Sequence, residues 1–498
     1  MKVFVDNSSK LFEEVSYTWR IFAQNIGLDF VFVSEPGSAD IQIGKEIKGR
    51  GSAGGNGSVG GNGSGNGSRS LGGSLGGSVG GENGSVGGNG TVGGNGSLGG
   101  SAGIKDGEGE RTNTSDYHYS ALFEKNYLLG NWAFEKVLND KGWVELEGGR
   151  IDWLLSAFYF LNSLQEYPQG GKLGSLDEVG RFQYKLSYQA HFNSALENKV
   201  QFCFDQLLLE IPQLSGFKKK IRPTRVFLTH DIDSIYGAFR EDRNYWLKRF
   251  NPFMAAKVVL NELLGNPGWF TIDRIMKIED EYDLKSTFFW LVNQGKVNER
   301  ELNADYDLHS PMVWNALERL NHRGWENGIH KSISSDSLQL EMEKAKFQPA
   351  ANRYHYLKFQ LPGLYDSVEQ AGLKLDASLG FAEQYGFRNS YALPFTPFNV
   401  KERRPYALVE APLHIMDGTF QRYMNVSGVD AGKAMVDFFE AHAANAVISV
   451  LWHNSFCTDY KYGEFFKAYK TLLVYLYEKG IKSIGAAEIV KEFELTGN

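Results

Sequence analysis

The sequence predicts an α/β protein whose larger part is a distorted (β/α) barrel. From Arg225 onward, short apolar segments alternate with amphipathic segments of helical spacing, which is typical of a parallel sheet or barrel. The roughly 270 residues involved match the size of one such barrel. The expected strands are 226–229, 286–291, 326–329, 408–411, 447–451 and 481–484, and the expected helices include Met312–Arg323, Ser335–Phe347, Gly432–His442 and Glu464–Lys479.

A smaller α/β domain is expected before the barrel. Apolar spacing predicts a helix over Leu11–Ile26, then short strands over Asp29–Val33 and Asp40–Ile43. A largely apolar and therefore buried helix is expected over Ile151–Leu164. The chain is accordingly divided into the first part of the N-terminal domain (1–48), a low-complexity insertion (49–103), the remainder of that domain (104–222) and the barrel (223–498).

The segment from Gly49 to Gly103 has no pattern that could build a core. It is rich in glycine, serine and asparagine, it holds 26 of the 57 glycines, and its apolar residues are single and unevenly spaced. We expect a disordered coil without a catalytic role, inserted into the surface of the N-terminal domain. Such an insertion costs little stability because the entropy of closing a loop grows only with the logarithm of its length.

The bulk composition excludes several classes of function. The net charge is −7, the pI is about 5.9 and no basic cluster is found, so nucleic acid is not an expected partner. Cys203 and Cys457 are too few for a disulfide scaffold. The first residues lack the pattern of a signal peptide. No apolar run approaches the ~18 residues of a membrane span, and we therefore expect a cytoplasmic protein.

Two carboxylates follow the first strand of the predicted barrel. Residues 226–233 read Val-Phe-Leu-Thr-His-Asp-Ile-Asp, so an apolar strand ends at Asp231 and Asp233. In barrels and open α/β sheets, chemistry is found at the carboxyl ends of the strands. Two acids this close cannot both be buried and charged without help. A metal ion bound by one acid, with the other acid free as a base, is the simplest arrangement that solves this problem.

Polar side chains also end later strands in the same half of the chain. His330 and His453 each close an apolar segment, Asp376 stands at another strand end, and the run Asn-Arg-Tyr-His-Tyr at 352–356 follows a helix. A single histidine at a strand end is more often a hydrogen-bonded structural residue. A barrel, however, would bring all of these strand ends to one face, which favours a common site.

In this order the motifs resemble those of the divalent-metal polysaccharide deacetylases, carbohydrate esterase family four. The matching runs are Thr-His-Asp-Ile-Asp, Gly-Ile-His-Lys-Ser, Asn-Arg-x-His-Tyr-Leu-Lys-Phe, Asp-x-Ser-x-Gly-Phe and Leu-Trp-His-Asn. The sequence is most similar to a bacterial branch with an extra N-terminal domain, whose signature resembles residues 156–167 and 179–182. The resemblance covers residues 117–498 and implies the distorted barrel of that family. It also implies removal of acetyl groups from sugar polymers through a metal-bound water.

The resemblance implies a chemical role for four of the matched residues. Asp233 and His330 match metal ligands, and Asp231 matches the general base that takes a proton from the attacking water. His453 matches the general acid that protonates the leaving amine. A bound metal ion would lower the pKa of the water, polarise the acetyl carbonyl and keep Asp231 ionised.

Three further residues are implied as supports of this chemistry. Arg353 would hold Asp231 by charge-assisted hydrogen bonds. Asp376 would orient His453, as a carboxylate does in other acid–base pairs. The backbone N–H of Tyr356 would stabilise the oxyanion alongside the metal.

The third metal ligand departs from the family pattern. The family has two histidines four residues apart in its second motif, and the second position here is Ser334, a poor neutral ligand. The third motif carries His355 where the family has proline. We favour His355 as the third ligand, because catalytic zinc sites keep three protein ligands. The alternative is a site that holds metal weakly or not at all, in a protein that only binds glycan. Aspartate and histidine suit Zn²⁺ first, with Co²⁺ or Ni²⁺ as alternatives.

Another enzyme class fits these residues less well. An Asp-x-Asp run also marks metal-dependent glycosyltransferases, but that function would leave His330 and His453 unexplained. Trp452 is a candidate wall of a sugar-binding pocket. Asp417 and Phe395 lie in stretches that also resemble the family, without an evident role. The expected partner is an acetylated glycan, and the sequence carries no signal for a particular glycan or oligomeric state.

Overall fold

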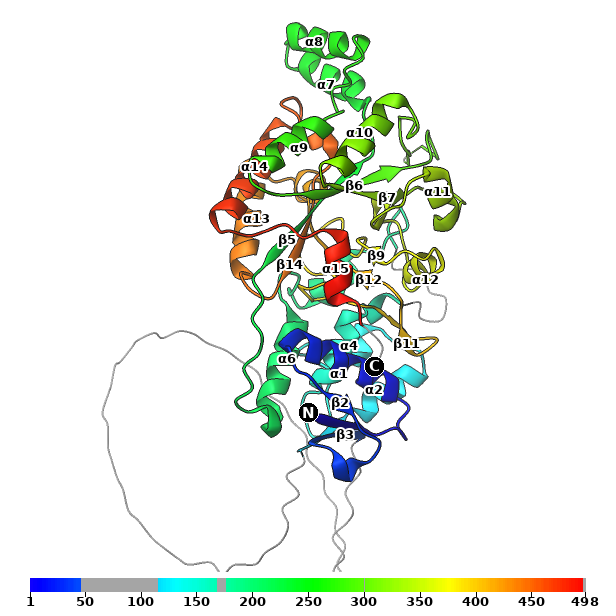
Figure 1. Ribbon diagram of the computed structural model, residues 1–498, viewed down its shortest axis with the longest axis vertical. Coiled ribbons are helices and arrows are strands. Elements are labelled where there is room, and N and C mark those ends of the chain that lie inside the picture. Colours follow the sequence, from blue (N-terminus) through cyan, green and yellow to red (C-terminus); the bar gives the residue numbers. More distant parts are fainter. Residues whose placement is uncertain (46–114, 168–175, 300, 496–498) are drawn as a thin grey trace, which may run out of the picture. The chain divides into compact units, whose positions relative to one another are not determined.

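The computed structural model describes residues 1–45, 115–167, 176–299 and 301–495 (Figure 1). The insertion expected at 49–103 lies outside the described residues, as do residues 104–114 of the expected N-terminal domain. The domain boundaries therefore stay predictions. Among the residues that are described, no helix has both the length and the apolar character needed to cross a lipid bilayer.

The N-terminal part builds a four-stranded sheet in the order β2-β1-β3-β4. Its strands are β1 (Lys2–Val5), β2 (Val31–Phe32), β3 (Ile41–Lys45) and β4 (Ser115–Tyr119). All neighbours are parallel. β3 and β4 pair with Ile43 opposite Tyr117, although residues 46–114 separate them in the chain. The sequence on both sides of the glycine-rich segment therefore enters one sheet.

Helices supply most of the core of this part. They are α1 (Phe12–Ile26), α2 (Ala121–Leu128), α3 (Phe134–Val137), α4 (Trp153–Leu161), α5 (Tyr188–His191) and α6 (Lys199–Glu210). The helix predicted at 11–26 is confirmed as α1. The apolar helix predicted at 151–164 is confirmed as α4, in which every residue is buried. The Asp152 carboxylate caps α4 by accepting a hydrogen bond from the backbone N–H of Leu155 at 3.1 Å.

The second half builds a curled sheet of eight parallel strands in the order β12-β9-β8-β7-β6-β5-β14-β13 (Figure 1). The strands are β5 (Arg225–Ile232), β6 (Ser286–Leu291), β7 (Glu326–Lys331), β8 (Asn352–Tyr354), β9 (Leu375–Asp376), β12 (Val409–Glu410), β13 (Leu413–Met416) and β14 (Val447–Leu451). A short antiparallel pair, β10 (Phe398–Asn399) and β11 (Arg404–Pro405), lies outside this sheet. The hydrogen-bonded order runs from β12 to β13 without closing, so the sheet is a half-barrel. This architecture is consistent with the predicted (β/α) barrel.

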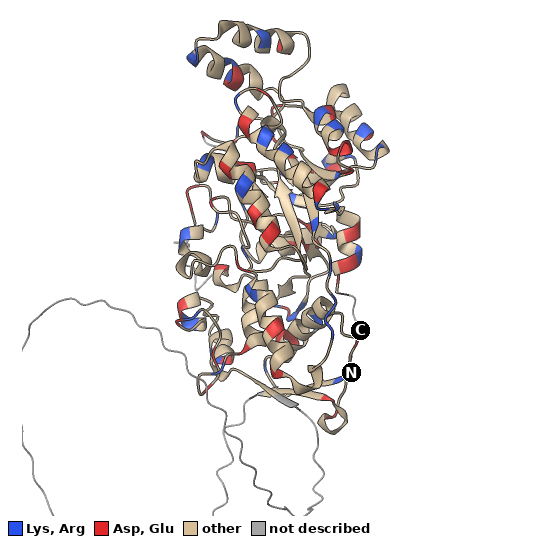
Figure 2. Ribbon diagram, turned by 90° about the vertical axis from the view of Figure 1, so that its left-hand side faces the viewer, with Lys and Arg blue, Asp and Glu red and all other residues tan. Residues whose placement is uncertain are grey.

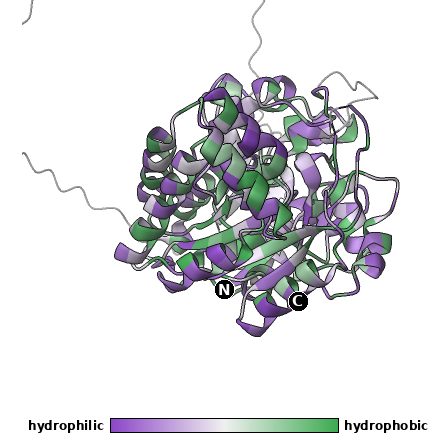
Figure 3. Cartoon of the chain, turned by 90° about the horizontal axis from the view of Figure 1, so that it is seen from above, coloured by the Kyte–Doolittle hydropathy of each residue, from purple (hydrophilic) through white to green (hydrophobic). Residues whose placement is uncertain are grey.

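Amphipathic helices connect most of these strands, and Figure 3 shows hydrophobic and hydrophilic stretches on the same helices. They are α7 (Gly237–Lys248), α8 (Pro252–Leu263), α9 (Ile272–Asp280), α10 (Pro311–His322), α11 (Leu338–Ala345), α12 (Gly363–Gln370), α13 (Gly428–Ala441), α14 (Gly463–Glu478) and α15 (Ala486–Phe493). The four helices predicted in this half are confirmed as α10, α11, α13 and α14.

The strand predicted at 481–484 is wrong. This segment makes only one bridge to the sheet, between Ser483 and Val226 of β5. One edge of β5 is taken by β14 from Arg225 onward, and β6 takes the other edge from Leu228 onward. Only the first few residues of β5 have backbone groups that β6 does not bind. Residues 481–484 can therefore form a single bridge there but not a strand.

Polar contacts tie the N-terminal part to the half-barrel near the carboxyl ends of its strands. The guanidinium of Arg388 donates from Nε and Nη2 to the two carboxylate oxygens of Glu166, at 2.8 and 2.6 Å. Both side chains are buried, and Arg388 Nη1 also donates to the Gly380 carbonyl at 2.7 Å. A bidentate ion pair of this kind fixes the orientation of the two side chains as well as the distance between them. It therefore helps to hold the N-terminal part against the half-barrel.

Gly328 controls the spacing of the strands that carry the site. A Cβ at this position of β7 would lie 2.7 Å from the Phe289 ring of β6 and 2.9 Å from the Ala351 carbonyl oxygen. Gly328→Ala is expected to lower the free energy of unfolding by about 1–3 kcal/mol, because the strands must move apart. Urea unfolding measures this change. Gly363→Ala is the matched control, since its Cβ would meet nothing within 4 Å, and equal losses in both variants would contradict the prediction.

Candidate functional site

The strand ends of the half-barrel surround a cavity of about 110 Å³. This volume suits a few water molecules or a small acyl group. Six of the eight residues given roles from the sequence line the cavity: Asp231, Asp233, His330, His355, Tyr356 and His453. They come from the ends of β5, β7, β8 and β14, so the expected convergence at one face of the sheet is present.

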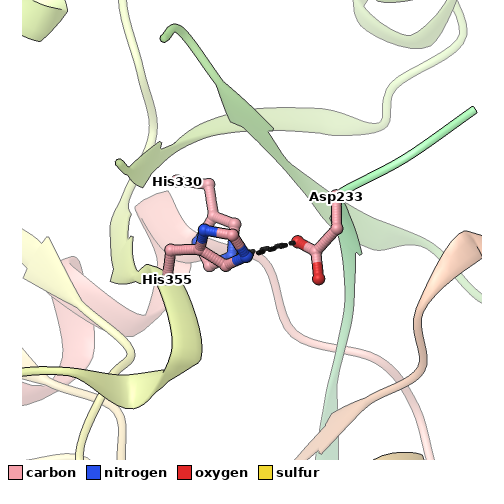
Figure 4. A group of neighbouring side chains, drawn as sticks. All are labelled: Asp233, His330 and His355. Atoms are coloured by element: carbon pink, nitrogen blue, oxygen red, sulfur yellow. Dashed lines mark ion pairs between the residues drawn. The ribbon is translucent and has the colours of Figure 1, made fainter. Parts of the chain in front are cut away.

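Three side chains in this cavity form a cluster with the donor atoms of a metal site. One donor atom each from Asp233, His330 and His355 lies within 4.8 Å of the others. Figure 4 shows the two imidazole rings beside each other, with the Asp233 carboxylate facing them. Asp233 Oδ1 lies 3.3 Å from His330 Nε2 and 3.6 Å from His355 Nε2. Ligands of a tetrahedral zinc ion stand about 3.4 Å apart, given bonds of about 2.1 Å, so both distances from Asp233 fit.

The hydrogen bonding around the cluster leaves its donor atoms available. His330 Nδ1 lies 2.8 Å from the Arg353 carbonyl oxygen. A carbonyl only accepts, so Nδ1 carries the proton and the lone pair of Nε2 faces Asp233. Asp233 Oδ1 is buried without a hydrogen-bond partner, as is His355 Nδ1. An orphaned carboxylate oxygen between two imidazole nitrogens is the arrangement that a divalent cation would satisfy.

Charge within the cluster shifts the pKa values of its members. Burial alone would raise the pKa of Asp233, but the rings of His355, His330 and His453 outweigh it and hold that pKa well below its usual value. Burial lowers the pKa of His355. Burial acts in the same direction on His330, where the negative charges of Asp231 and Asp233 reverse it and raise the pKa. The aspartate is therefore held as a carboxylate and His355 as a neutral ring, the forms that bind metal.

Ser334, the other candidate for the third ligand, is engaged elsewhere. Its hydroxyl donates to Glu341 Oε1 at 2.8 Å and accepts a hydrogen bond from the Lys331 ammonium at 3.4 Å. Lys331 also pairs with Glu341 at 2.7 Å. The Ser334 hydroxyl is thus hydrogen-bonded to the Lys331–Glu341 ion pair and does not take part in the cluster around Asp233. Of the two alternatives, the structure brings His355 to the cluster.

Asp231 is held as the sequence predicts. Arg353 Nη1 donates to Asp231 Oδ1 at 3.0 Å and to the Thr229 hydroxyl at 2.8 Å, and Arg353 Nε donates to the Ala377 carbonyl at 2.8 Å. Arg353 and Asp231 are both buried. The second carboxylate oxygen of Asp231 lies 3.5 Å from His330 Nε2. One oxygen is therefore fixed by the guanidinium while the other faces the cluster, as a base beside a bound water requires.

His453 is oriented by Asp417, and the predicted role of Asp376 is wrong. His453 Nδ1 donates to Asp417 Oδ1 at 2.7 Å, and the backbone N–H of His453 donates to the other oxygen of the same carboxylate. His453 Nε2 then lies 3.5 Å from Asp233 Oδ2, inside the cavity. Burial would lower the pKa of His453, but the Asp417 carboxylate, with smaller contributions from Asp233 and Asp231, outweighs it and raises that pKa to about 10. The imidazole is thereby held in the protonated form of a general acid.

The strand order explains why Asp376 cannot serve His453. Asp376 lies on β9, near one end of the sheet, and His453 follows β14, near the other end. Its carboxylate accepts hydrogen bonds from Asn352 Nδ2 at 2.6 Å and from the backbone N–H of Ser378 at 3.0 Å. Glu410 stands opposite Asp376 in the parallel pairing. Burial raises the pKa of both carboxyls, that of Glu410 far above its usual value, so a protonated Glu410 relieves the repulsion.

Tyr356 has an unusual backbone beside the cluster. Its φ of 58° and that of Leu357, 52°, lie in the left-handed region, which bulky residues rarely adopt and which is often found at functional sites. The Tyr356 ring stacks on the His355 ring, with centroids 4.1 Å apart. This contact packs His355 in place. The role predicted for the Tyr356 N–H toward an oxyanion stays a prediction.

The sequence assigned no role to three residues in or beside the cavity. Arg181 of the N-terminal part and Arg422 line its wall, and Asp417 holds His453. Asp417 follows directly on β13, so the rule that polar residues end the strands could have identified it. Trp452, in contrast, is fully buried and stacks on Tyr469 at 5.5 Å. The prediction that it forms a pocket wall is wrong, because its side chain points into the core.

Comparisons with known proteins add distant structural likeness only. No protein-family model matches the sequence, and no curated protein matches it. Similar solved structures include a protein from Mycobacterium smegmatis provisionally assigned as a polysaccharide deacetylase, with 13% identity over 56% of this chain and 94% of that chain and a TM-score of 0.35. The chitin deacetylase of the fungus Colletotrichum lindemuthianum matches with 13% identity over 54% of this chain and 88% of that chain, at a TM-score of 0.30. A mutant of the peptidoglycan deacetylase PdaC from Bacillus subtilis matches with 13% identity over 54% of this chain and 91% of that chain, at a TM-score of 0.28. At these identities and TM-scores, the likeness by itself assigns neither activity nor substrate.

Proposed function

We propose that the protein is a metal-dependent hydrolase that removes acetyl groups, N-acetyl groups foremost, from a sugar or polysaccharide. The observation that carries this proposal is the composition of one small cavity. It combines a three-residue donor set with a carboxylate base and a protonated imidazole. Hydrolysis of an amide needs these three elements, because water must be activated, the oxyanion stabilised and the leaving amine protonated.

The donor set fits a divalent transition metal, with Zn²⁺ as the first candidate and Co²⁺ or Ni²⁺ as alternatives. Asp233, His330 and His355 would hold the ion. When bound, it would supply Lewis acidity toward a water molecule and an acyl oxygen. The carbonyl of Arg353 fixes the His330 tautomer that leaves Nε2 free to bind it.

The remaining residues of the cavity handle protons. Asp231, fixed by Arg353, accepts a proton from the attacking water. His453, fixed by Asp417, gives its Nε2 proton to the leaving amine. The backbone N–H of Tyr356 serves the developing oxyanion. The cavity volume of about 110 Å³ supports an acetyl group as the part that enters, while the sugar remains outside.

Metal removal tests the proposal. Purified protein is expected to hold about one transition-metal ion per chain, as measured by elemental analysis, and to release acetate from N-acetylglucosamine oligomers. Dialysis against a strong chelator should abolish acetate release, and Zn²⁺ should restore it. Mg²⁺ is the control and should not restore it, because histidine ligands suit it poorly.

The Asp231→Asn variant distinguishes a hydrolase from a protein that only binds glycan. Asp231→Asn is expected to retain the metal, because Asp231 is outside the donor set, and to lose acetate release. A protein that binds glycan oligomers but holds no metal, with the Asp231→Asn variant behaving as wild type, would contradict the hydrolase and favour the non-catalytic glycan-binding alternative.

A further inference from the structure

Helices α7 and α8 form a small unit with its own apolar contacts. The two helices follow the Asp233 loop and pack on each other. Ala238, Val258 and Trp269 make a cluster of buried residues separate from the main core. Figure 1 shows the pair at the top, beyond α9 and α10. The pair therefore presents an outer surface that the main body of the protein does not cover.

That outer surface is apolar to an unusual degree. We call it the apolar tip; it consists of Leu247, Phe250, Phe253, Leu260, Leu263 and Leu264. Phe250, at the turn between the helices, is 93% exposed, and Phe253 is 77% exposed. Large apolar side chains this open to water are unfavourable, and several of them on one helix pair indicate an interaction surface.

The spacing of these residues shows that the exposure is a property of one helix face. Phe253, Leu260 and Leu264 recur at intervals of seven and four residues along and just after α8, so they share one side of the helix. Ala255 and Val258 lie on the other side and are buried against the rest of the pair. α8 is thus apolar on both faces, although only one face is needed for packing in the pair.

Basic residues accompany the apolar tip. Residues 243–257 contain four basic side chains, Arg243, Lys248, Arg249 and Lys257, and no acidic one, in a chain of net charge −7. Within the described part of the chain, Lys248, Arg249 and Lys257 form no ion pair with a carboxylate. Figure 2 shows both blue, basic segments and red, acidic segments on these helices. Over the whole pair, residues 237–263, five basic residues outnumber the three acidic residues Glu241, Asp242 and Glu262, so the local charge is positive, opposite to that of the whole protein.

We propose that the apolar tip docks the protein on a membrane surface that contains anionic lipids. Exposed aromatic and aliphatic side chains beside lysine and arginine are the pattern of an interfacial anchor, in which rings enter the acyl boundary and cations meet the headgroups. Anionic lipid surfaces attract such basic residues within a Debye length. A bilayer also needs no shape complementarity, which suits rings displayed on a turn between two helices.

A second copy of the chain fits this surface less well. Self-association through the apolar tip would bring Lys248, Arg249 and Lys257 of one copy close to the same residues of the other, and like charges across an interface are unfavourable. The acidic residues of the pair, Glu241, Asp242 and Glu262, are outnumbered by its five basic residues and would not compensate them fully. The charge pattern therefore favours an anionic lipid surface over a copy of the protein.

Vesicle sedimentation tests the proposal on the full chain. The wild-type protein is expected to pellet with vesicles of phosphatidylcholine containing about 30% phosphatidylserine, and much less with pure phosphatidylcholine. Phe250→Ser/Phe253→Ser should lower the bound-to-free ratio about tenfold or more, because two rings no longer enter the lipid. Lys248→Glu/Arg249→Glu should lower it as well, and raised salt should weaken wild-type binding.

The matched control replaces two highly exposed leucines outside the helix pair. Leu129 is 68% exposed and Leu209 is 77% exposed, and Leu129→Ser/Leu209→Ser should bind vesicles as the wild type does. Circular dichroism melting checks that each variant is folded. Wild-type protein that stays in the supernatant with anionic vesicles would overturn the proposal. So would dimers, seen by sedimentation velocity without lipid, that Phe250→Ser/Phe253→Ser abolishes, since a second copy would then cover the tip.

Discussion

Replacing His355 with alanine is expected to lower the affinity for Zn²⁺ at least about a hundredfold and to reduce acetate release to background. Loss of an outer-shell partner already costs about ten- to a hundredfold in affinity, and His355 is a proposed direct ligand whose Nε2 lies 3.6 Å from Asp233 Oδ1. Two protein donors would remain, fewer than catalytic zinc sites keep. Competition with a chromophoric chelator measures the affinity, and a coupled acetate assay measures the reaction.

Ser334→Ala is the matched control for this prediction. Ser334 stands where the family pattern has its second histidine, but its hydroxyl is bonded to Glu341. The variant should therefore keep both metal affinity and acetate release within about a factor of two of wild type, with a small loss of stability from the broken hydrogen bond. If Ser334→Ala loses the metal while His355→Ala retains it, the ligand assignment is wrong.

The second large effect is expected at His453. His453→Ala should lower kcat for acetate release by about 10²–10⁴-fold, which is the usual contribution of a positioned acid, while the metal content stays unchanged. The histidine lies outside the three-residue donor set, although its Nε2 faces Asp233 Oδ2 at 3.5 Å. Parallel loss of metal and activity in His453→Ala would make this residue a ligand and not the acid.

Asp417→Asn tests how His453 is kept protonated. The Asp417 carboxylate makes the largest contribution to raising the pKa of His453 to about 10, and the charges of Asp233 and Asp231 add to it. An acid is active only below its pKa, so activity falls as the pH rises through that value. Asparagine removes the negative charge and lowers the pKa, and the alkaline limb of the pH profile of kcat should move to lower pH than in wild type. A bound cation lowers this pKa in both proteins, so the difference between the two limbs is the quantity to measure.

The companion variant distinguishes orientation by Asp417 from orientation by Asp376. Asp376→Asn should leave the alkaline limb in place, because Asp376 is hydrogen-bonded to Asn352 and Ser378 and not to His453. A shifted limb in Asp376→Asn with an unmoved limb in Asp417→Asn would contradict the structural assignment.

Much of the fold and part of the site follow from the sequence in physical terms. Helical periodicity is a local property, and it located α1, α4, α10, α11, α13 and α14 within a few residues. The carboxyl ends of parallel strands lie along the same side of a barrel, which predicted that Asp231, Asp233, His330 and His453 lie close together. The structure places all four in one cavity.

The remaining features depend on strand order, which the sequence does not display. Asp376 and Asp417 are both acids at strand ends, and only the sheet order shows that β13 adjoins β14 whereas β9 does not. The 481–484 segment has the apolar pattern of a strand, but the edge it would need is taken by β6. Trp452 likewise adjoins His453 in sequence, although alternate residues of an extended chain point in opposite directions.

Arg353 contacts both the proposed base and a proposed metal ligand, through its side chain and its backbone. Its guanidinium restrains Asp231, whereas its carbonyl oxygen sets the protonated nitrogen of His330. Every amino acid has a carbonyl, so a substitution at this position that preserves the strand would abolish only the first of these contacts. If the proposed chemistry holds, a variant at this position is expected to bind a cation and yet release no acetate.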